Sequence, residues 1–307
     1  MEDLHWNYRN RPDGRRAVTD FFYNNKTKYG RLCVIVPSKA RRLFRSVEVC
    51  SDMEQKKIGQ IKEEYQKLKI EEMDLFIEAY QADVRAGVQR LVGQAKKKKE
   101  QYERELLRTE NLKYYERKYA QYACICGIDE VGRGPLAGPV VAGAVILPKD
   151  CSILYINDSK QLSASRREEL YDIIMEQAVA AETGMASPQR IDEINILQAD
   201  YEAMREAISK LAVKPDILFN DAVTIPEIEI PQVPIIKGDA KSISIGAASI
   251  IAKVVRDRMM VEYDAIYPEY GFASNKGYGS AEHIAALQKY GPCPIHRRSF
   301  IRNIVTV

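Results

Sequence analysis

The sequence lacks any apolar run near the ~18 residues of a membrane span, and its first residues, MEDLHWNYRN, contain no apolar core of a secretory signal. The 307 residues are 46% hydrophobic and 29% charged, which is typical of a globular protein with a sizeable core. We therefore expect no membrane association and a cytoplasmic location. The length fits one large domain with an appendage, or two ordinary domains.

Cysteine and histidine are too few and too scattered for a zinc site. The six cysteines contain no pair of CxxC motifs, and there are only three histidines. Cys124 and Cys126 stand two apart in a strand-like run, so both would face the same side. We interpret them as small buried hydrophobic residues, with a redox or regulatory pair as the alternative.

Excess positive charge is also scarce, because the net charge is only +3. It is unevenly distributed. Residues 1–50 contain 11 Lys and Arg against 5 Asp and Glu, whereas the other 257 residues hold 35 basic and 38 acidic groups. A body that is nearly neutral must concentrate positive charge locally in order to hold phosphates.

Residues 1–50 form a basic and aromatic segment that we leave unassigned. Its apolar stretch at 32–36 ends at Pro37 and predicts a strand. Arginine mixed with aromatic residues is typical of nucleic-acid surfaces. A small αβ element, or a stretch with no fold of its own, is an equally open interpretation.

Residues 51–120 are predicted to form a helical extension. The stretch from 54 to 118 has no proline and is rich in Glu, Lys, Gln, Leu and Ala. Its apolar residues recur at helical spacing, for example Ile58, Ile61, Tyr65 and Leu68, which predicts two or three helices. The lysine run at 96–99 is typical of a solvated face, and contact with a phosphate backbone is the alternative.

Residues 121–307 are predicted to form an α/β domain around a central sheet. Strand-like apolar runs alternate with helical patterns, which indicates this class. The expected helices are 165–178 and 197–211, and the expected strands are 124–129, 140–147, 180–185, 217–221 and 233–236.

The most informative stretch is GIDEVGRGPLAGP at 127–139, where two carboxylates run into a glycine-rich loop. A dinucleotide-binding loop would need a helix after the glycines. The β-branched run at 140–147 predicts a strand instead, which excludes that site. Asp129 and Glu130 can share one site only where their strand ends, because neighbouring side chains in a strand face opposite sides. Alone, this pair is compatible with ordinary solvated acids.

Two further acids follow apolar strands in the same way. Asp221 ends the run at 217–221, and Asp239 lies between the last predicted strand and a long helix. Open α/β sheets place their ligand crevice at the ends of such strands. Clustered carboxylates repel one another, and hard divalent cations such as Mg²⁺ or Mn²⁺ relieve that repulsion.

Several long motifs together resemble one family, ribonuclease HII. The motifs occur in the family's order and cover about residues 123–299; they are DEVGRGPLAGP at 129–139, NDSKQLS at 157–163, KGD at 237–239, AASIIAKVVRD at 247–257, KGYG at 276–279 and HRRSF at 296–300. The resemblance implies an RNase H-like mixed sheet flanked by helices, preceded by the helical extension.

The resemblance also implies an activity. The enzyme would hydrolyse the RNA strand of RNA–DNA hybrids and incise 5′ of single ribonucleotides in duplex DNA, leaving 5′-phosphate and 3′-hydroxyl ends. The implied catalytic and metal-binding residues are Asp129, Glu130, Asp221 and Asp239. Two Mg²⁺ or Mn²⁺ ions held there suit phosphodiester hydrolysis, because they neutralise charge at the attacking and leaving oxygens.

Substrate-binding roles are implied for a second set of residues. Gly132, Arg133 and Gly134 would sense the ribose 2′-hydroxyl, the group that distinguishes RNA from DNA, and Tyr278 would pack against the sugar. The expected phosphate contacts are Ser159, Lys160, His296 and Arg297.

Three alternatives accompany this interpretation. The sister enzyme ribonuclease HIII prefers longer RNA tracts, but the intact Gly-Arg-Gly sequence and the lack of a recognisable sheet-forming N-terminal platform argue against it. A nucleic-acid-binding protein with a dead site is disfavoured because all four carboxylates are present. Residues 1–50 can also be a separate interaction module. We expect a monomer.

Overall fold

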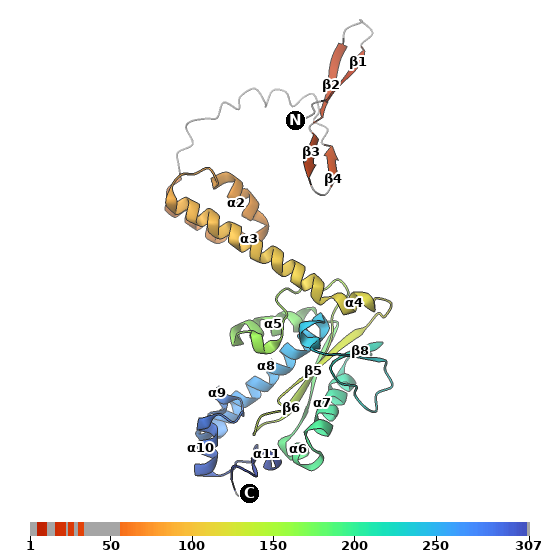
Figure 1. Ribbon diagram of the computed structural model, residues 1–307, viewed down its shortest axis with the longest axis vertical. Helices are drawn as coiled ribbons and strands as arrows, with labels where there is room; N and C mark the ends of the chain where they lie inside the picture. Colours follow the sequence, from red (N-terminus) through yellow and green to blue (C-terminus); the bar gives the residue numbers. More distant parts are fainter. Residues whose placement is uncertain (1–4, 11–15, 23, 28–29, 34–55, 306–307) are drawn as a thin grey trace. The chain divides into compact units, whose positions relative to one another are not determined.

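The computed structural model describes residues 5–10, 16–22, 24–27, 30–33 and 56–305 (Figure 1). The chain divides into two compact units. One comprises residues 1–68 and 84–88, and the other comprises residues 69–83 and 89–307.

The N-terminal segment contains more strand than the sequence predicted. Strands β1 (His5–Asn10) and β2 (Arg16–Phe22) pair antiparallel, as do β3 (Asn24–Thr27) and β4 (Gly30–Cys33). The single strand expected at 32–36 overlaps β4 only at its first two residues, and the rest lies outside the described residues. The described part of this segment thus contains two strand pairs where the sequence indicated a single strand.

The helical extension is confirmed. It consists of α1 (Ile58–Lys67), α2 (Met73–Tyr80), α3 (Ala86–Leu112) and the short α4 (Tyr114–Lys118), with a 3₁₀ turn η2 (Ile70–Glu72) before α2. Helix α3 is 27 residues long because no proline or clustered glycine interrupts it. None of the helices described is both long and apolar enough to cross a membrane.

The second unit is built on the predicted mixed sheet, whose strand order is β7-β6-β5-β8-β9. Strand β6 pairs antiparallel with both β5 and β7, whereas β5, β8 and β9 run parallel. The strands are β5 (Ile125–Val131), β6 (Val140–Ile146), β7 (Ala180–Ala186), β8 (Ile217–Asp221) and β9 (Gln232–Ile235). Each lies within two residues of its predicted position.

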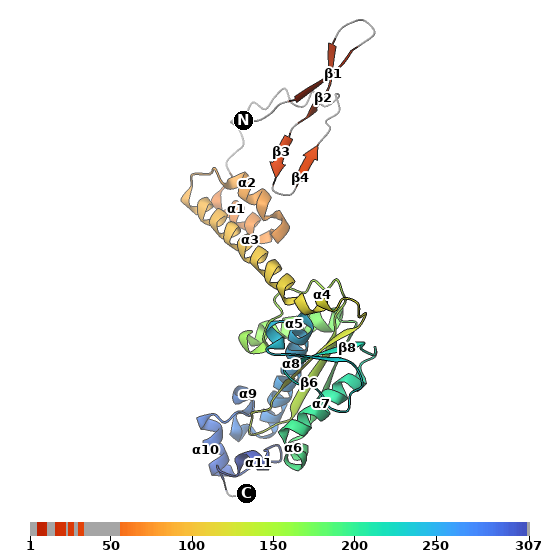
Figure 2. The same cartoon turned by 45° about the vertical axis from the view of Figure 1, so that its right-hand side comes forward.

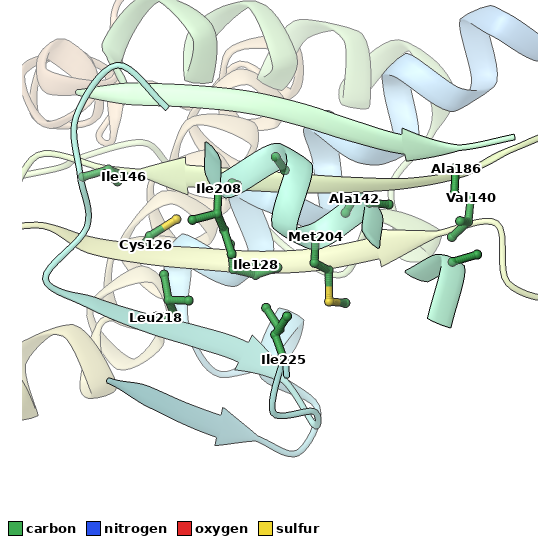
Figure 3. Packing of buried hydrophobic residues seen from close by; sticks show 14 of the residues in the cluster. Cys126, Ile128, Val140, Ala142, Ile146, Ala186, Met204, Ile208, Leu218 and Ile225 are labelled. Atoms are coloured by element: carbon green, nitrogen blue, oxygen red, sulfur yellow. The ribbon is translucent and has the colours of Figure 1, made fainter. Parts of the chain in front are cut away.

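Helices cover both faces of the sheet (Figure 2). On one face α6 (Pro188–Ile194) and α7 (Ile196–Lys210) close a core with alternate strand residues. Figure 3 shows this core, where Ile128 and Leu218 meet Met204 and Ile208 of α7. Cys126 is buried in it and Cys124 packs against it, which confirms the interpretation of both as small hydrophobic residues.

The opposite face packs against α5 (Ala164–Gln177) and α8 (Ile243–Ile266). Helix α8 lies unusually close to the sheet. A Cβ atom on Gly127 would lie 2.1 Å from the backbone carbon of Ser244, and one on Gly143 would lie 2.4 Å from the Ala248 carbonyl oxygen. The small residues of α8 therefore form a close-packing face against the sheet.

The C-terminal part forms a third core beside α8. Its helices are α9 (Phe272–Asn275), α10 (Ala281–Tyr290) and α11 (Arg298–Ile301), with 3₁₀ turns η3 (Ser159–Gln161), η4 (Gly238–Ala240) and η5 (Pro268–Tyr270) elsewhere in the unit. Ala137 of the glycine-rich loop is buried in this core and pairs through its backbone with His296.

Candidate active site

The predicted carboxylates gather at the carboxyl ends of the three parallel strands. Ile128 of β5 is paired with Asn220 of β8, so Asp129 and Asp221 end up side by side on adjacent strands. Asp221 is in turn paired with Ile235 of β9, and Asp239 follows β9 in the turn η4. The parallel register therefore brings together acids that are 110 residues apart in the sequence.

Asp129 and Glu130 lie within β5 rather than just beyond it, because the strand continues to Val131. Their side chains therefore face opposite sides of the sheet, as the strand repeat requires. Asp129 meets Ser249 of α8, whereas Glu130 interacts with Arg133 and with Asp200 of α7. The expected strand end falls two residues later than predicted.

The carboxylates repel one another in a partly dry environment. Burial raises the pKa of Asp129 well above its usual value, and the charges of Glu130 and Asp221 raise it further. Burial likewise raises the pKa of Glu130, with a contribution from Asp221 that Arg133 opposes. Burial and Asp221 also raise the pKa of Asp239. Asp221 is thus the common neighbour of the other three.

The donor set fits a hard divalent cation by its chemistry. All four candidates offer carboxylate oxygens, and Glu130 Oε2 is buried without a hydrogen-bond partner among the described residues. Over the same part of the chain, no three acidic, histidine or cysteine side chains converge as tightly as one ion requires. Asp221 is thus near enough to the other three acids to raise their pKa values, but the four carboxylates do not converge on one point in this structure.

Two hydroxyls lie between Asp129 and a second motif. Ser249 on α8 lies close enough to Asp129 to oppose the rise in its pKa, and the Ser249 hydroxyl lies 2.9 Å from that of Ser159. Ser159 is buried, so its hydroxyl faces Ser249 and not a substrate. Lys160 beside it is exposed, and its positive charge partly offsets the rise in the pKa values of Glu130 and Asp239 that burial causes. Lys160 is therefore an exposed cation near two of the acids.

The glycine-rich loop lies next to Tyr278, the residue predicted to share a site with it. Gly132 has φ +96°, and a Cβ there would clash with Arg256 at 2.3 Å, so only glycine fits. At Gly134 a Cβ would meet only the Tyr278 ring, at 3.8 Å. Gly277 also accepts hydrogen bonds from the Leu136 and Ala137 amides. The loop therefore presents open backbone at Gly134 next to an exposed tyrosine ring.

Two buried arginines, Arg297 and Arg256, hold this loop by hydrogen bonds to its backbone carbonyls. Arg297 donates from Nε to the Gly138 carbonyl and from its two terminal nitrogens to the carbonyls of Arg133 and Gly132, at 2.5–3.0 Å. Arg256 donates in the same way to the carbonyls of Pro139, Ala137 and Lys276.

These contacts change the role assigned to Arg297. Both guanidinium side chains are 0% exposed, so Arg297 supports the loop, whereas the sequence suggested a phosphate contact. The sequence suggested no role for Arg256. No pattern in the sequence distinguishes an arginine that binds carbonyls from one on the surface.

His296 is also buried, and it belongs to a hydrogen-bonded chain that ends at Tyr278. The Cys293 amide donates to His296 Nδ1, and His296 Nε2 lies 3.0 Å from His283 Nε2. His283 Nδ1 lies 2.8 Å from the Tyr278 carbonyl oxygen. One neutral tautomer of each ring satisfies every link, with His296 donating to His283 and His283 donating to Tyr278. His296 therefore supports Tyr278 from within the core.

Asp200 on α7 is a site residue that the sequence did not indicate. It is 1% exposed, and neither carboxylate oxygen has a hydrogen-bond partner within residues 56–305. Its Oδ2 lies 3.6 Å from Arg133 Nε, while Arg133 Nη1 lies 3.5 Å from Glu130 Oε1. Arg133 thus bridges Glu130 and Asp200. Helical spacing predicted that Asp200 would lie in a helix, but not that the helix would bury it here.

Comparisons with known proteins identify the family that this chain resembles. The family model for ribonuclease HII matches residues 126–303, and the model for the ribonuclease HII N-terminal domain matches residues 57–120. The chain is 65% identical over 227 residues to ribonuclease HII of Lachnoclostridium phytofermentans, covering 74% of this chain and 89% of that protein. It is 49% identical over 255 residues to ribonuclease HII of Clostridioides difficile, covering 82% of this chain and 100% of that protein.

A solved structure is similar as well. The structure of a PCNA:RNase HII complex from Archaeoglobus fulgidus matches with a TM-score of 0.50 and 28% sequence identity. The match covers 60% of this chain and 97% of that chain.

Proposed function

The chain belongs to the ribonuclease HII family, whose members cleave RNA in RNA–DNA hybrids, and from this premise we propose which of its residues perform the reaction. Asp129, Glu130, Asp221 and Asp239 form the catalytic centre, and the loop at 132–134 with Tyr278 reads the ribose. The proposal rests on one observation above all: the loop with open backbone at Gly134 begins directly after the strand that carries Asp129 and Glu130.

The four carboxylates would hold Mg²⁺ or Mn²⁺. Such ions supply a nucleophilic water at neutral pH and neutralise charge that develops on the scissile phosphate. The protein's own contribution is positional. The parallel register of β5, β8 and β9 fixes the positions of the acids on their strands, and Ser249 lies beside Asp129, where its hydroxyl can orient the carboxylate.

Ribose recognition is assigned to the backbone at Gly134 and to the aromatic ring of Tyr278. Open backbone at Gly134 lets peptide groups approach a 2′-hydroxyl closely, and the Tyr278 ring, 43% exposed, offers a flat surface for the adjacent sugar. This pairing requires only one ribonucleotide at the loop. The enzyme would therefore also incise duplex DNA 5′ of a single embedded ribonucleotide, leaving 5′-phosphate and 3′-hydroxyl ends.

Phosphate binding is assigned to exposed cations. Lys160 lies near Glu130 and Asp239, and the Arg133 guanidinium is 42% exposed between Glu130 and Asp200. Either can contact a backbone phosphate without leaving the site. The sister enzyme ribonuclease HIII is set aside, because both matching family models are those of ribonuclease HII.

The decisive assay compares a DNA duplex containing one ribonucleotide with a long RNA–DNA hybrid, in Mg²⁺ and in Mn²⁺. We expect both to be cleaved, with the single ribonucleotide cut on its 5′ side and the ends identified by ligation and phosphatase treatment. Cleavage of the long hybrid alone would contradict the assignment of the loop and Tyr278 to a single ribose.

A further inference from the structure

The end of the helical extension contacts the catalytic unit beside three of its motifs. These contacts come from α3 and α4, between residues 105 and 119, and all of them lie within the second compact unit. The proposed function gives this segment no role.

The first contact supports the backbone that leads into the motif at 157–163. Glu105 accepts a hydrogen bond from the Tyr155 amide at 2.6 Å, and Arg108 donates to the Ile156 carbonyl at 2.6 Å. Arg108 also forms a two-pronged ion pair with Glu105 at 2.7 Å. Tyr155 has φ +69°, which is unfavourable for a residue with a side chain, so its conformation needs such support.

The second contact supports the turn that carries Asp239. Glu116 of α4 accepts hydrogen bonds from the Ser242 hydroxyl at 2.6 Å and the Ser244 amide at 3.1 Å. The Ser242 amide donates to the Gly238 carbonyl, and the Gly238 amide donates to Asp221 Oδ1 at 2.7 Å. These hydrogen bonds link Glu116 to Asp221 through Ser242 and Gly238, the residue next to Asp239.

The third contact supports β8. The rings of Tyr115 and Tyr119 pack edge-on against Phe219, with centroids 6.3 and 5.4 Å from it. Phe219 is fully buried and lies two residues before Asp221 on the same strand. The three contacts therefore reach the segments that place Lys160, Asp239 and Asp221.

We infer that residues 105–119 are a positioning element, which holds the backbones at 155–160 and 238–244 in the conformation that the active site uses. None of these residues contacts the proposed metal or ribose sites, so they act through the loops. An effect of this element on metal and substrate binding rests on the proposed function. Its effect on the conformational order of the two loops does not.

Glu116→Ala tests the contact to the turn, and Glu116→Gln is its conservative partner. Glutamine keeps an acceptor oxygen for Ser242 and Ser244, whereas alanine removes it. The control is Glu110→Ala, which deletes an exposed carboxylate that pairs only locally with Lys113 and Arg117. We expect amide hydrogen exchange at 238–244 to speed up about tenfold or more in Glu116→Ala, and to stay near wild type in the other two.

Metal binding provides the functional measurement. Titration of Mn²⁺ into substrate-free protein should show about tenfold weaker affinity in Glu116→Ala, the usual effect of losing a supporting hydrogen bond. The Gln variant should recover the affinity. Equal losses in the Ala and Gln variants would overturn the inference, because charge and not loop order would then be responsible, as would unchanged exchange in the Ala variant.

The contact of Arg108 with the loop at 155–160 provides an independent experiment, which can also be done if Glu116→Ala does not fold. Arg108→Lys replaces the guanidinium that binds both Glu105 and the Ile156 carbonyl. Arg104→Lys is the control, because it changes an exposed arginine on the same helix. Faster exchange at 155–160 in Arg108→Lys alone supports the inference, and equal exchange in both variants overturns it. Faster exchange at 238–244 with unchanged Mn²⁺ affinity would support loop positioning and count against Asp239 as a ligand.

Discussion

The carboxylates and the arginines of this site are both buried charges, but the protein treats them in opposite ways. Each nitrogen of Arg256 and Arg297 donates to a backbone carbonyl, so six carbonyls receive a partner from two side chains. The acids instead repel one another, and Glu130 Oε2 has no partner within the described residues. One set of groups has completed its hydrogen bonding, and the other has not.

This difference distinguishes residues that stabilise the structure from residues that are available to bind a ligand. A buried group with all its hydrogen bonds made stabilises a conformation, whereas an incompletely paired buried group costs free energy and persists where a ligand completes it. The arginines therefore shape the glycine-rich loop, while the acids keep oxygen atoms available. Four substitutions or conditions test the comparison, from the largest expected effect to the smallest.

Asp129→Asn should reduce cleavage of a duplex containing one ribonucleotide by about 10³-fold or more, because it removes a charge from the group that would bind metal. The side chain keeps its size, so affinity for the uncleaved duplex should change little. Single-turnover incision and fluorescence anisotropy measure the two quantities. Incision at the wild-type rate would rule out the assignment of Asp129 to the catalytic centre.

Arg297→Lys should lower the free energy of unfolding by about 2–4 kcal/mol, because a single ammonium does not satisfy the three carbonyls of Gly132, Arg133 and Gly138. Discrimination between ribose and deoxyribose should weaken with it. Arg298→Lys, on an exposed neighbour, is the control in urea denaturation. A phosphate contact would instead leave stability unchanged and lower the salt dependence of binding by about one unit.

Acidification should destabilise the core around Tyr278. Burial, with repulsion from His283, lowers the pKa of His296 to about 4. Because the unfolded histidine binds a proton near pH 6.5, the stability that its neutral form contributes is complete above that pH. It is then lost as the pH falls towards about 4. The loss amounts to at most about 3 kcal/mol.

Urea denaturation between pH 7 and pH 4 measures this loss, and His296→Gln should flatten the dependence. If the stability of His296→Gln falls between pH 7 and pH 4 as much as that of the wild type, other groups are responsible for the loss.

Asp200→Asn should stabilise the protein at alkaline pH. Burial and the charge of Glu130 raise the pKa of Asp200 to about 8, against the opposing charge of Arg133. The unfolded chain releases this proton near pH 4, so the native state loses stability as the pH rises from about 4 to about 8. Asparagine removes that loss, and the gain should be a few kcal/mol at pH 8 and near zero at pH 4.

Thermal and urea denaturation at the two pH values test this prediction, with Glu202→Gln on the same helix as the control. A gain of equal size at pH 4 would attribute the effect to packing and not to the buried charge.

The architecture was largely predictable from local patterns. Apolar runs and helical spacing located the sheet strands and the helices α5 and α7 to within two residues, because burial on a sheet or helix face imposes a period on the sequence. The four acids were found because each stands at the end of an apolar run. The N-terminal strands were missed, since the sequence of 1–33 shows one apolar run where the structure has four short strands.

Burial of polar groups was not predictable. Arg297 lies in a basic run that indicates a surface, but the pairing of Ala137 with His296 draws the run inward. Asp200 and Arg133 are 67 residues apart in the sequence and meet only because α7 covers the sheet beside β5. Such contacts depend on how elements pack, and a single sequence contains no periodic signal for them.

Helix α8 has a consequence for where the enzyme cuts. Ser249, which lies beside Asp129, and Arg256, which holds the glycine-rich loop, stand seven residues apart on it. At 1.5 Å per residue the helix separates them by about 10 Å. Under the proposed assignment of the acids and the loop, this length would fix the spacing between the bond that is hydrolysed and the sugar that is recognised. The cut should fall at one fixed bond from the ribonucleotide, whatever bases surround it.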